Sequence, residues 1–247
     1  MGKKAEPLRR GSLQIPTKSS RPKRHPKQLS SEVIEAIITK RLARNRCAEV
    51  VHYELTQQGV VVSLSSVKRV LKRYRLLKER SPWKRPHDAT IRPEAVAPGS
   101  LVEIDTIHIV RPKRFYVYTI LDVYSRWAHA EVFQKVGVTS TLAFVTTAQQ
   151  QSPFSFSLLQ SDHGSEFAHG FTLGVGVAHR HTRVRTPNDN AHLERFNRTV
   201  QEECLYHVGP TPQRYQAALD AYLPYYNNER SHLSLNFRTP REVFTSY

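Results

Sequence analysis

Residues 101–110 read Leu-Val-Glu-Ile-Asp-Thr-Ile-His-Ile-Val, an apolar run with an acid, Asp105, near its centre. Two further short runs, 115–124 and 127–133, are rich in Val, Ile, Tyr and Phe and are separated by short polar segments. Such runs predict three strands in an antiparallel meander. An ionised carboxylate inside a strand is costly to desolvate unless a cation or hydrogen bonds compensate it. Asp105 therefore calls for a reason beyond folding.

The pattern changes after residue 133. Helical and strand-like segments alternate at 139–151 (helix), 154–160 (strand), 166–173 (helix or loop), 176–182 (strand) and 188–206 (helix). Three consecutive strands followed by this alternation predict a mixed α/β sheet with helices on its faces. In such a sheet, acids from the first strand, from the end of the fourth strand and from a covering helix can meet at one edge.

Two further acids occupy those positions. Asp162 ends the run Phe154–Asp162, and Glu194 lies in Asn-Ala-His-Leu-Glu-Arg-Phe-Asn at 190–197. Like Asp105, both are hard to explain by folding alone, and together they suggest a shared positive ligand. Mg²⁺ is bound by oxygen ligands, so the three carboxylates predict a magnesium site.

The charge is distributed very unevenly along the 247 residues. The net charge is +16, and residues 1–100 hold 23 Lys and Arg against 8 acids, whereas residues 101–247 hold 14 against 13. A strongly basic half predicts a polyanionic partner. Only Cys47 and Cys204 are present, which supports neither a disulfide framework nor a Cys-rich zinc site and fits a reducing, cytoplasmic location. Since no apolar run approaches transmembrane length, we expect no membrane partner.

The basic half divides into three parts by composition. Residues 1–28 predict a disordered basic arm, residues 29–77 a small all-α domain, and residues 78–98 a basic, Pro-rich linker, which leaves 99–247 for the sheet and its C-terminal helices. The arm would either contact phosphates or remain a solvated tail.

Helical spacing in residues 29–77 predicts three helices. The first begins after Ser30 with Ser31 as its N-cap, the second covers about 47–57, and the third starts at Ser65. A Gly-containing connection before a basic last helix is the layout of a helix-turn-helix, whose last helix enters the major groove. The predicted DNA-contacting residues are Ser65, Ser66, Lys68, Arg69, Lys72 and Arg73. The alternative is a packing unit whose basic face is merely solvated.

Five local motifs occur in an order that resembles one known family. They are Glu103-Ile-Asp105-Thr, Thr119-Ile-Leu-Asp-Val-Tyr-Ser-Arg126, Ser161-Asp-His-Gly-Ser-Glu-Phe167, Thr186-Pro-Asn-Asp-Asn-Ala-His-Leu-Glu-Arg-Phe-Asn-Arg198, and Tyr226-Asn-Asn-Glu-Arg-Ser-His232 followed by Thr239-Pro240. In this order they resemble bacterial insertion-sequence transposases that have a DDE catalytic core of the retroviral-integrase type. The resemblance extends over nearly all of residues 30–243.

The resemblance implies an RNase H-like fold and a metal-dependent transposase. Asp105, Asp162 and Glu194 would be the catalytic residues and would hold two Mg²⁺ or Mn²⁺ ions, with Asp105 bridging them. Two divalent ions stabilise the attacking and leaving oxygens of a phosphodiester. The implied reactions are cleavage of the element's ends and strand transfer into target DNA. The protein would act on double-stranded DNA as a homo-oligomer in the bacterial cytoplasm, associated with the nucleoid when bound.

Several acids also admit simpler interpretations. Glu194 could pair with Arg198 four residues later on an exposed helix face, and Asp162 could form a strand-ending Asx turn. Glu103 alternates with Asp105 and could be a decoy on the same face, whereas Glu166 is expected to be structural or accessory. In the catalytic interpretation, Asn190 and Arg198 lie on a polar stripe of the Glu194 helix and contact phosphate.

Two departures from the family pattern leave other functions open. The 31 residues between Asp162 and Glu194 are fewer than the family norm by about four, roughly one helical turn. The family's additional upstream helix-turn-helix would also have to precede residue 1. One alternative is a catalytically decayed DNA-binding relic or regulator of the element, and another is a structure-selective nuclease of the same fold.

Overall fold

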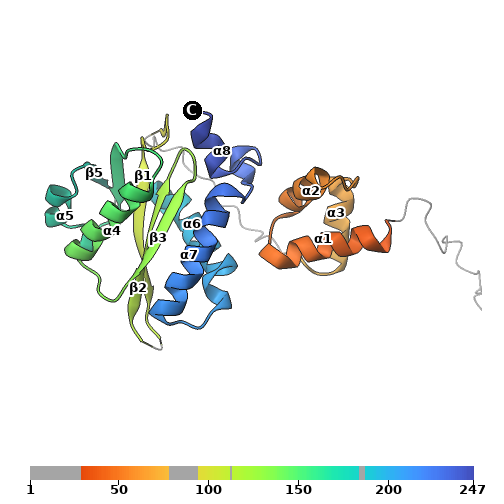
Figure 1. The fold of residues 1–247 in the computed structure, drawn as a ribbon, viewed down its shortest axis with the longest axis horizontal. Helices are drawn as coiled ribbons and strands as arrows, with labels where there is room; N and C mark the ends of the chain where they lie inside the picture. Colours follow the sequence, from red (N-terminus) through yellow and green to blue (C-terminus); the bar gives the residue numbers. More distant parts are fainter. Residues whose placement is uncertain (1–28, 78–93, 112, 184–186) are drawn as a thin grey trace, which may run out of the picture.

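The structure is a computed structural model that describes residues 29–77, 94–111, 113–183 and 187–247 (Figure 1). The predicted arm at 1–28 and most of the predicted linker at 78–98 lie outside the described residues. Across the described part of the chain, no helix combines the length and apolarity needed to cross a bilayer.

The first described segment is a three-helix unit, residues 29–77. It consists of α1 (Ser31–Arg44), α2 (Ala48–Gln57) and α3 (Leu64–Arg73), which share a core of their own. The N-cap prediction was wrong by one residue: Ser30 caps α1, because its backbone is extended and its Oγ accepts a hydrogen bond from the Val33 N–H at 3.4 Å.

Residues 94–247 form the sheet unit, whose five strands have the order β3-β2-β1-β4-β5. The strands are β1 (Val102–Ile109), β2 (Phe115–Asp122), β3 (Ala128–Phe133), β4 (Leu158–Ser161) and β5 (Ala178–His181). The first three pair antiparallel, which confirms the predicted meander, and β4 and β5 join them in parallel. The fourth strand starts later than predicted because the Phe154 and Phe156 rings pack against Trp127 instead.

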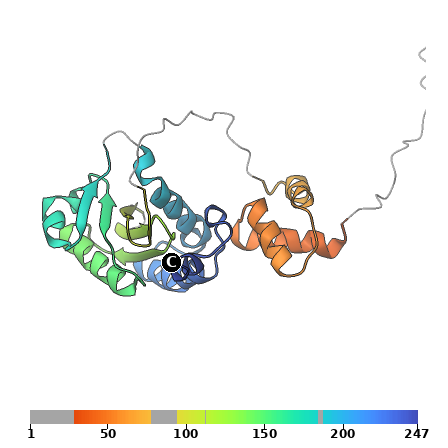
Figure 2. The same cartoon turned by 90° about the horizontal axis from the view of Figure 1, so that it is seen from above.

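Helices cover both faces of the sheet. They are α4 (Val138–Gln151), η1 (Ser165–Phe167), α5 (His169–Gly174), η2 (Pro187–Asn190), α6 (Ala191–Glu203), η3 (Leu205–His207), α7 (Pro212–Asn228), η4 (Leu233–Leu235) and α8 (Pro240–Thr245). Figures 1 and 2 show α4 and α5 on one face and α6 and α7 on the other. The predicted mixed α/β sheet with helices on both faces is confirmed.

The alternation of side chains along β1 decides which face carries Asp105. Val102 and Ile104 belong to the core beneath α4, whereas Ile107 and Ile109 pack into the core beneath α6 and α7. Because successive strand residues point to opposite faces, Asp105 is directed toward α6.

Asp122 at the end of β2 is a structural acid. Its carboxylate is fully buried and accepts hydrogen bonds from the Gly99 N–H at 2.9 Å and from the N–H and hydroxyl of Ser125 at 2.7 and 2.6 Å. A side chain at Gly99 would place its Cβ 2.0 Å from the Ser155 carbonyl oxygen, and φ there is +76°, so only glycine fits. Asp122 thus ties the start of the sheet unit to the β2–β3 turn.

Candidate active site

Asp105 lies in the central strand of the sheet, flanked by β2 and β4. One carboxylate oxygen accepts a hydrogen bond from the Thr106 N–H at 2.7 Å, and the other accepts one from Nδ2 of Asn197 in α6 at 2.9 Å. The contact with Asn197 joins the central strand directly to the helix that carries Glu194. The Asn197 side chain is buried.

The pKa of Asp105 indicates which acids surround it. Burial raises this pKa from 3.8 to about 6, the Thr106 hydrogen bond opposes the rise, and the negative charges of Asp162, Glu166 and Glu194 add to it. Like charges near a carboxylate disfavour its ionised form. The fold therefore brings the three predicted acids, and Glu166 with them, into one electrostatic neighbourhood.

Asp162 follows β4 directly, and strand register explains its position. In the parallel pair of β1 and β4, Glu103 lies opposite Gln160. Two residues further along both strands, this register leads to Asp105 and Asp162. Asp162 is exposed, and its Oδ1 accepts a hydrogen bond from the Gly164 N–H at 2.9 Å. The predicted Asx turn is therefore present, and it orients the carboxylate at the end of the strand.

Glu166, which was expected to be structural or accessory, lies beside Asp162. It is 7% exposed, and a Cβ atom at Gly164 would lie 2.7 Å from its Oε2 and 3.1 Å from Oδ1 of Asp162. A side chain at position 164 would therefore displace the Glu166 carboxylate and crowd that of Asp162. The sequence signal for this packing was the Asp-His-Gly-Ser-Glu motif itself.

Glu194 lies in the first turn of α6 and is exposed. The start of this helix is held by Glu103, which is 2% exposed and accepts a hydrogen bond from the Leu193 N–H at 2.8 Å. Glu103 is therefore more than a decoy beside Asp105. A carboxylate at a helix N-terminus satisfies an otherwise unpaired N–H and favours the helix dipole.

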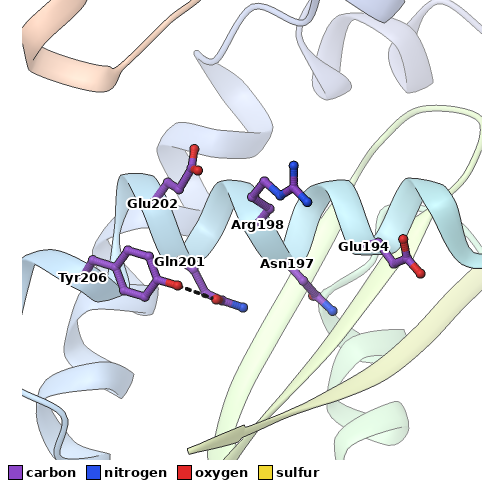
Figure 3. A pocket seen from close by; sticks show the side chains of 6 residues that line it. All are labelled: Glu194, Asn197, Arg198, Gln201, Glu202 and Tyr206. Carbon is purple, nitrogen blue, oxygen red and sulfur yellow. Dashed lines mark hydrogen bonds between the residues drawn. The ribbon is translucent and has the colours of Figure 1, made fainter. Parts of the chain in front are cut away.

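An open groove of about 450 Å³ runs along α6 from Glu194. It is lined by Glu194, Asn197, Arg198, Gln201, Glu202 and Tyr206 (Figure 3). Asn197 and Gln201 point to one side of the helix, and Arg198 points to the other (Figure 3). Among the ion pairs of the described residues, none joins Glu194 to Arg198, so the simple surface-pair interpretation of Glu194 is not supported.

The carboxylates remain spread out rather than closed around one point. Within the described ranges, no three His, Cys, Asp or Glu side chains are arranged so that they could hold a metal ion as they stand. The fold thus places the acids at neighbouring positions, with Asp162 and Glu194 both exposed.

Two contacts that sequence reasoning missed hold the segment before α6. Asp189 is 4% exposed and accepts hydrogen bonds from Nε and Nη2 of Arg183 at 3.0 and 2.7 Å, and these bonds hold the pKa of Asp189 at about 2. Nε2 of Gln160 in β4 donates to the Asp189 carbonyl at 2.7 Å. No periodic pattern in the sequence marks either contact. The predicted phosphate-binding Asn190 lies beside them, half-buried, whereas Arg198 is exposed.

The residues predicted to contact DNA lie together on α3. Ser65, Lys68, Arg69, Lys72 and Arg73 are exposed, and Ser66 is half-buried. Lys68 forms an ion pair with Glu49 of α2 at 2.7 Å, and Nη2 of Arg69 donates to Oγ of Ser66 at 3.2 Å. The face is accessible and strongly basic, as phosphate binding requires.

The sheet unit matches known protein-family profiles. Residues 95–187 and residues 175–240 each match a profile described as an integrase core domain. The two matches together span 95–240, which is more than half of the chain. They include the positions of Asp105, Asp162 and Glu194.

Two curated relatives match at low identity. ORF3 of Spiroplasma virus SpV1-C74, which is named as an integrase, is 28% identical over 160 residues. The transposase for insertion sequence element IS904 of Lactococcus lactis is 25% identical over 160 residues. The matches cover 54% and 60% of this chain, and 43% and 62% of those relatives.

Solved structures support the fold. The simian T-cell lymphotropic virus intasome contains a chain that aligns with a TM-score of 0.56 at 14% identity, over 85% of this chain and 75% of that one. The magnesium complex of the HTLV-2 integrase catalytic core domain aligns with a TM-score of 0.50 at 14% identity, over 61% of this chain and 99% of that one. The sheet and its helices therefore have the retroviral-integrase, RNase H-like architecture.

Proposed function

Since this chain belongs to the integrase core domain family, we propose that it is an insertion-sequence transposase that cleaves DNA ends and transfers them into target DNA. Its catalytic carboxylates are Asp105, Asp162 and Glu194. The relatives named as an integrase and a transposase support the general activity. The assignment of these three residues rests on their positions in the fold.

The observation that carries this proposal is the placement of the acids: the β1–β4 register puts Asp162 beside Asp105, and the Asn197 hydrogen bond joins Asp105 to the helix of Glu194. Burial and the negative charges of Asp162, Glu166 and Glu194 raise the pKa of Asp105 to about 6. A group of carboxylates that repel one another in a partly buried place is stabilised by a divalent cation, which Asp and Glu oxygens suit as ligands. The donor set therefore fits Mg²⁺ or Mn²⁺, and the magnesium complex of the HTLV-2 core is consistent with it.

Asp105, Asp162 and Glu194 would hold the metal as a pair of ions. When bound, such ions stabilise charge on the attacking and leaving oxygens of a phosphodiester and activate the attacking oxygen. Asn197 orients the Asp105 carboxylate by its hydrogen bond, and Glu103 fixes the start of α6. The Asx turn at Gly164 sets the direction of Asp162.

DNA recognition is assigned to the three-helix unit as a helix-turn-helix. The contacts with the major groove and its phosphates come from Ser65, Ser66, Lys68, Arg69, Lys72 and Arg73 of α3. Asn190 and Arg198 contact phosphate near the carboxylates. Because two DNA ends have to be joined, the active form is a homo-oligomer on double-stranded DNA.

Cleavage and joining of labelled DNA that carries the element's ends tests this proposal. With Mg²⁺ or Mn²⁺ present, Asp105→Asn, Asp162→Asn and Glu194→Gln should each abolish both reactions and leave the gel-shift affinity nearly unchanged. Asp220→Asn is the matched control, because Asp220 is an exposed acid on α7 that does not line the groove. Full activity in any of the three variants would remove that residue from the site.

A second candidate is a DNA-binding relic or regulator without catalysis. One observation favours this alternative. Among the described residues, no three carboxylates are already arranged so that they could hold a metal ion. Binding of end DNA without any metal-dependent nicking by the unmodified protein would establish this alternative. Cleavage that follows branched DNA shape rather than end sequence would instead indicate a structure-selective nuclease.

A further inference from the structure

A buried group of charged side chains joins the three-helix unit to the sheet unit. Arg46 lies between α1 and α2 and is 4% exposed. Its guanidinium donates to the Ser231 carbonyl oxygen at 2.8 Å and lies 3.7 Å from the carboxylate of Glu203. Arg46 also lies 3.6 Å from Glu54 of its own unit. A single arginine thus bridges acids from both units.

The partner acid is itself rigidly held. Glu203, the last residue of α6, accepts two hydrogen bonds from Arg230, at 2.7 and 3.0 Å, and one from the Tyr222 hydroxyl at 2.9 Å. Burial alone would raise the pKa of Glu203, but the hydrogen bonds and charge of Arg230 and the charge of Arg46 hold it below its usual value. The carboxylate that pairs with Arg46 is therefore ionised and fixed in place.

Two aromatic contacts flank the charged group. The Arg44 guanidinium lies 4.0 Å from the centre of the Tyr225 ring, and the Tyr53 and Phe237 rings stack with centroids 4.6 Å apart and planes 10° from parallel. Figures 1 and 2 both show α1 and α2 next to the part of the sheet unit that precedes α8. An ion pair, a cation–π contact and a ring stack therefore join the two units in one docked arrangement.

Charges buried in this way define geometry more than they add stability. Removing two ions from water costs several kcal/mol per ion, so a buried pair tolerates few alternative arrangements. The interface also leaves the DNA-facing side of the unit free, because Lys72 and Arg73 of α3 stay exposed. The docked side is formed by the α1–α2 turn and by α2.

We propose that Arg46 and Glu203 form a latch that holds the recognition helix α3 at a fixed position relative to the α6 groove, so that both contact one continuous DNA segment. The latch acts within one chain, and it rests on the proposed function. Glu203 ends the helix whose first turn carries Glu194, about 14 Å away along the axis. The same helix thus connects the docked unit to the catalytic groove.

Docking is tested first, without DNA. In a Cys47→Ser background, Tyr53→Cys and Phe237→Cys are joined with a short bismaleimide, and adding Arg46→Gln should lower the yield of the intramolecular crosslink at least five-fold. Lys40→Gln is the control, since Lys40 pairs with Glu54 within its own unit at 3.9 Å and is 30% exposed. An equal yield of the intramolecular crosslink in the Arg46→Gln and Lys40→Gln variants would overturn the latch. Crosslinks that form only between two chains would overturn it as well.

Footprinting then tests its effect on DNA, in the absence of divalent metal so that no cutting intervenes. The unmodified protein should protect one continuous stretch of end DNA, whereas Arg46→Gln should keep the α3 part and lose the adjoining protection. An identical footprint in Arg46→Gln would overturn the latch. If DNA is bound continuously but never cut, the proposed catalytic function fails and the latch stands.

Discussion

Asn197 of α6 donates a hydrogen bond of 2.9 Å from its Nδ2 to Oδ2 of Asp105 in β1. The amide is buried, and its Oδ1 has no hydrogen-bond partner among the described residues. Its position suits it to orient one oxygen of the central carboxylate.

We expect Asn197→Leu to raise the pKa of Asp105 above its present value of about 6, because a hydrogen bond to the ionised form is lost. The measurement is an NMR titration of the Asp105 carboxyl in metal-free protein. DNA cleavage should fall at least ten-fold. Thr199→Ala is the control on the same helix, since the Thr199 hydroxyl donates to the Arg195 carbonyl at 2.9 Å, one turn away on α6. An unchanged titration curve would contradict the orienting role.

Asp105 also makes stability depend on pH when metal is absent. Its pKa in the folded protein, about 6, lies above the ordinary 3.8, so the folded state binds this proton more tightly than the unfolded chain does. The stabilisation is complete below about pH 4 and is lost as the pH rises through 6. The loss is at most about 3 kcal/mol.

Asp105→Asn should not show that loss. With EDTA present, urea unfolding should give similar stabilities for the two proteins near pH 4 and a more stable variant near pH 7.5. Mg²⁺ should then stabilise the unmodified protein more than the variant. Parallel pH profiles for the two proteins would contradict this account.

Glu103→Ala should weaken the start of α6. It leaves the Leu193 N–H without its acceptor and removes a carboxylate from the helix N-terminus, which should cost about 1–3 kcal/mol. Glu103→Gln keeps an acceptor and should lose less. Thermal unfolding of both variants is the measurement, and cleavage should fall in the same order. Equal stability of the two variants would show that the contact has little energetic value.

Lys72→Gln and Arg73→Gln test the assignment of α3 to DNA. Each lost phosphate contact should reduce the slope of log affinity against log salt concentration by about 0.9. Lys135→Gln is the matched control, because Lys135 is equally exposed but lies beyond β3. Filter binding over a range of salt concentrations gives the slopes. If the control reduces the slope as much, the effect comes from net charge and not from contacts by α3.

Local patterns in the chain were sufficient for the architecture. The turn-separated apolar runs predicted β1, β2 and β3, because strand formation there follows from side-chain type and short-range spacing. The same reasoning located Asp105, Asp162 and Glu194 at the ends and centres of predicted elements. It missed the N-cap by one residue, because Ser30 and Ser31 are equally suitable by type and only backbone geometry separates them.

The amino-acid sequence alone thus determined the fold class and the order of the elements, and it marked the three acids as candidates, since each depends on neighbours within a few residues. The tertiary structure decided their partners. Asn197 reaches Asp105 across 92 residues, Glu103 reaches the Leu193 N–H across 90, and Arg46 reaches the Ser231 carbonyl across 185. Such contacts leave no periodic trace, because they arise only when packing brings distant segments together. The pKa of Asp105 belongs with them, because burial and neighbouring charge exist only in the folded chain.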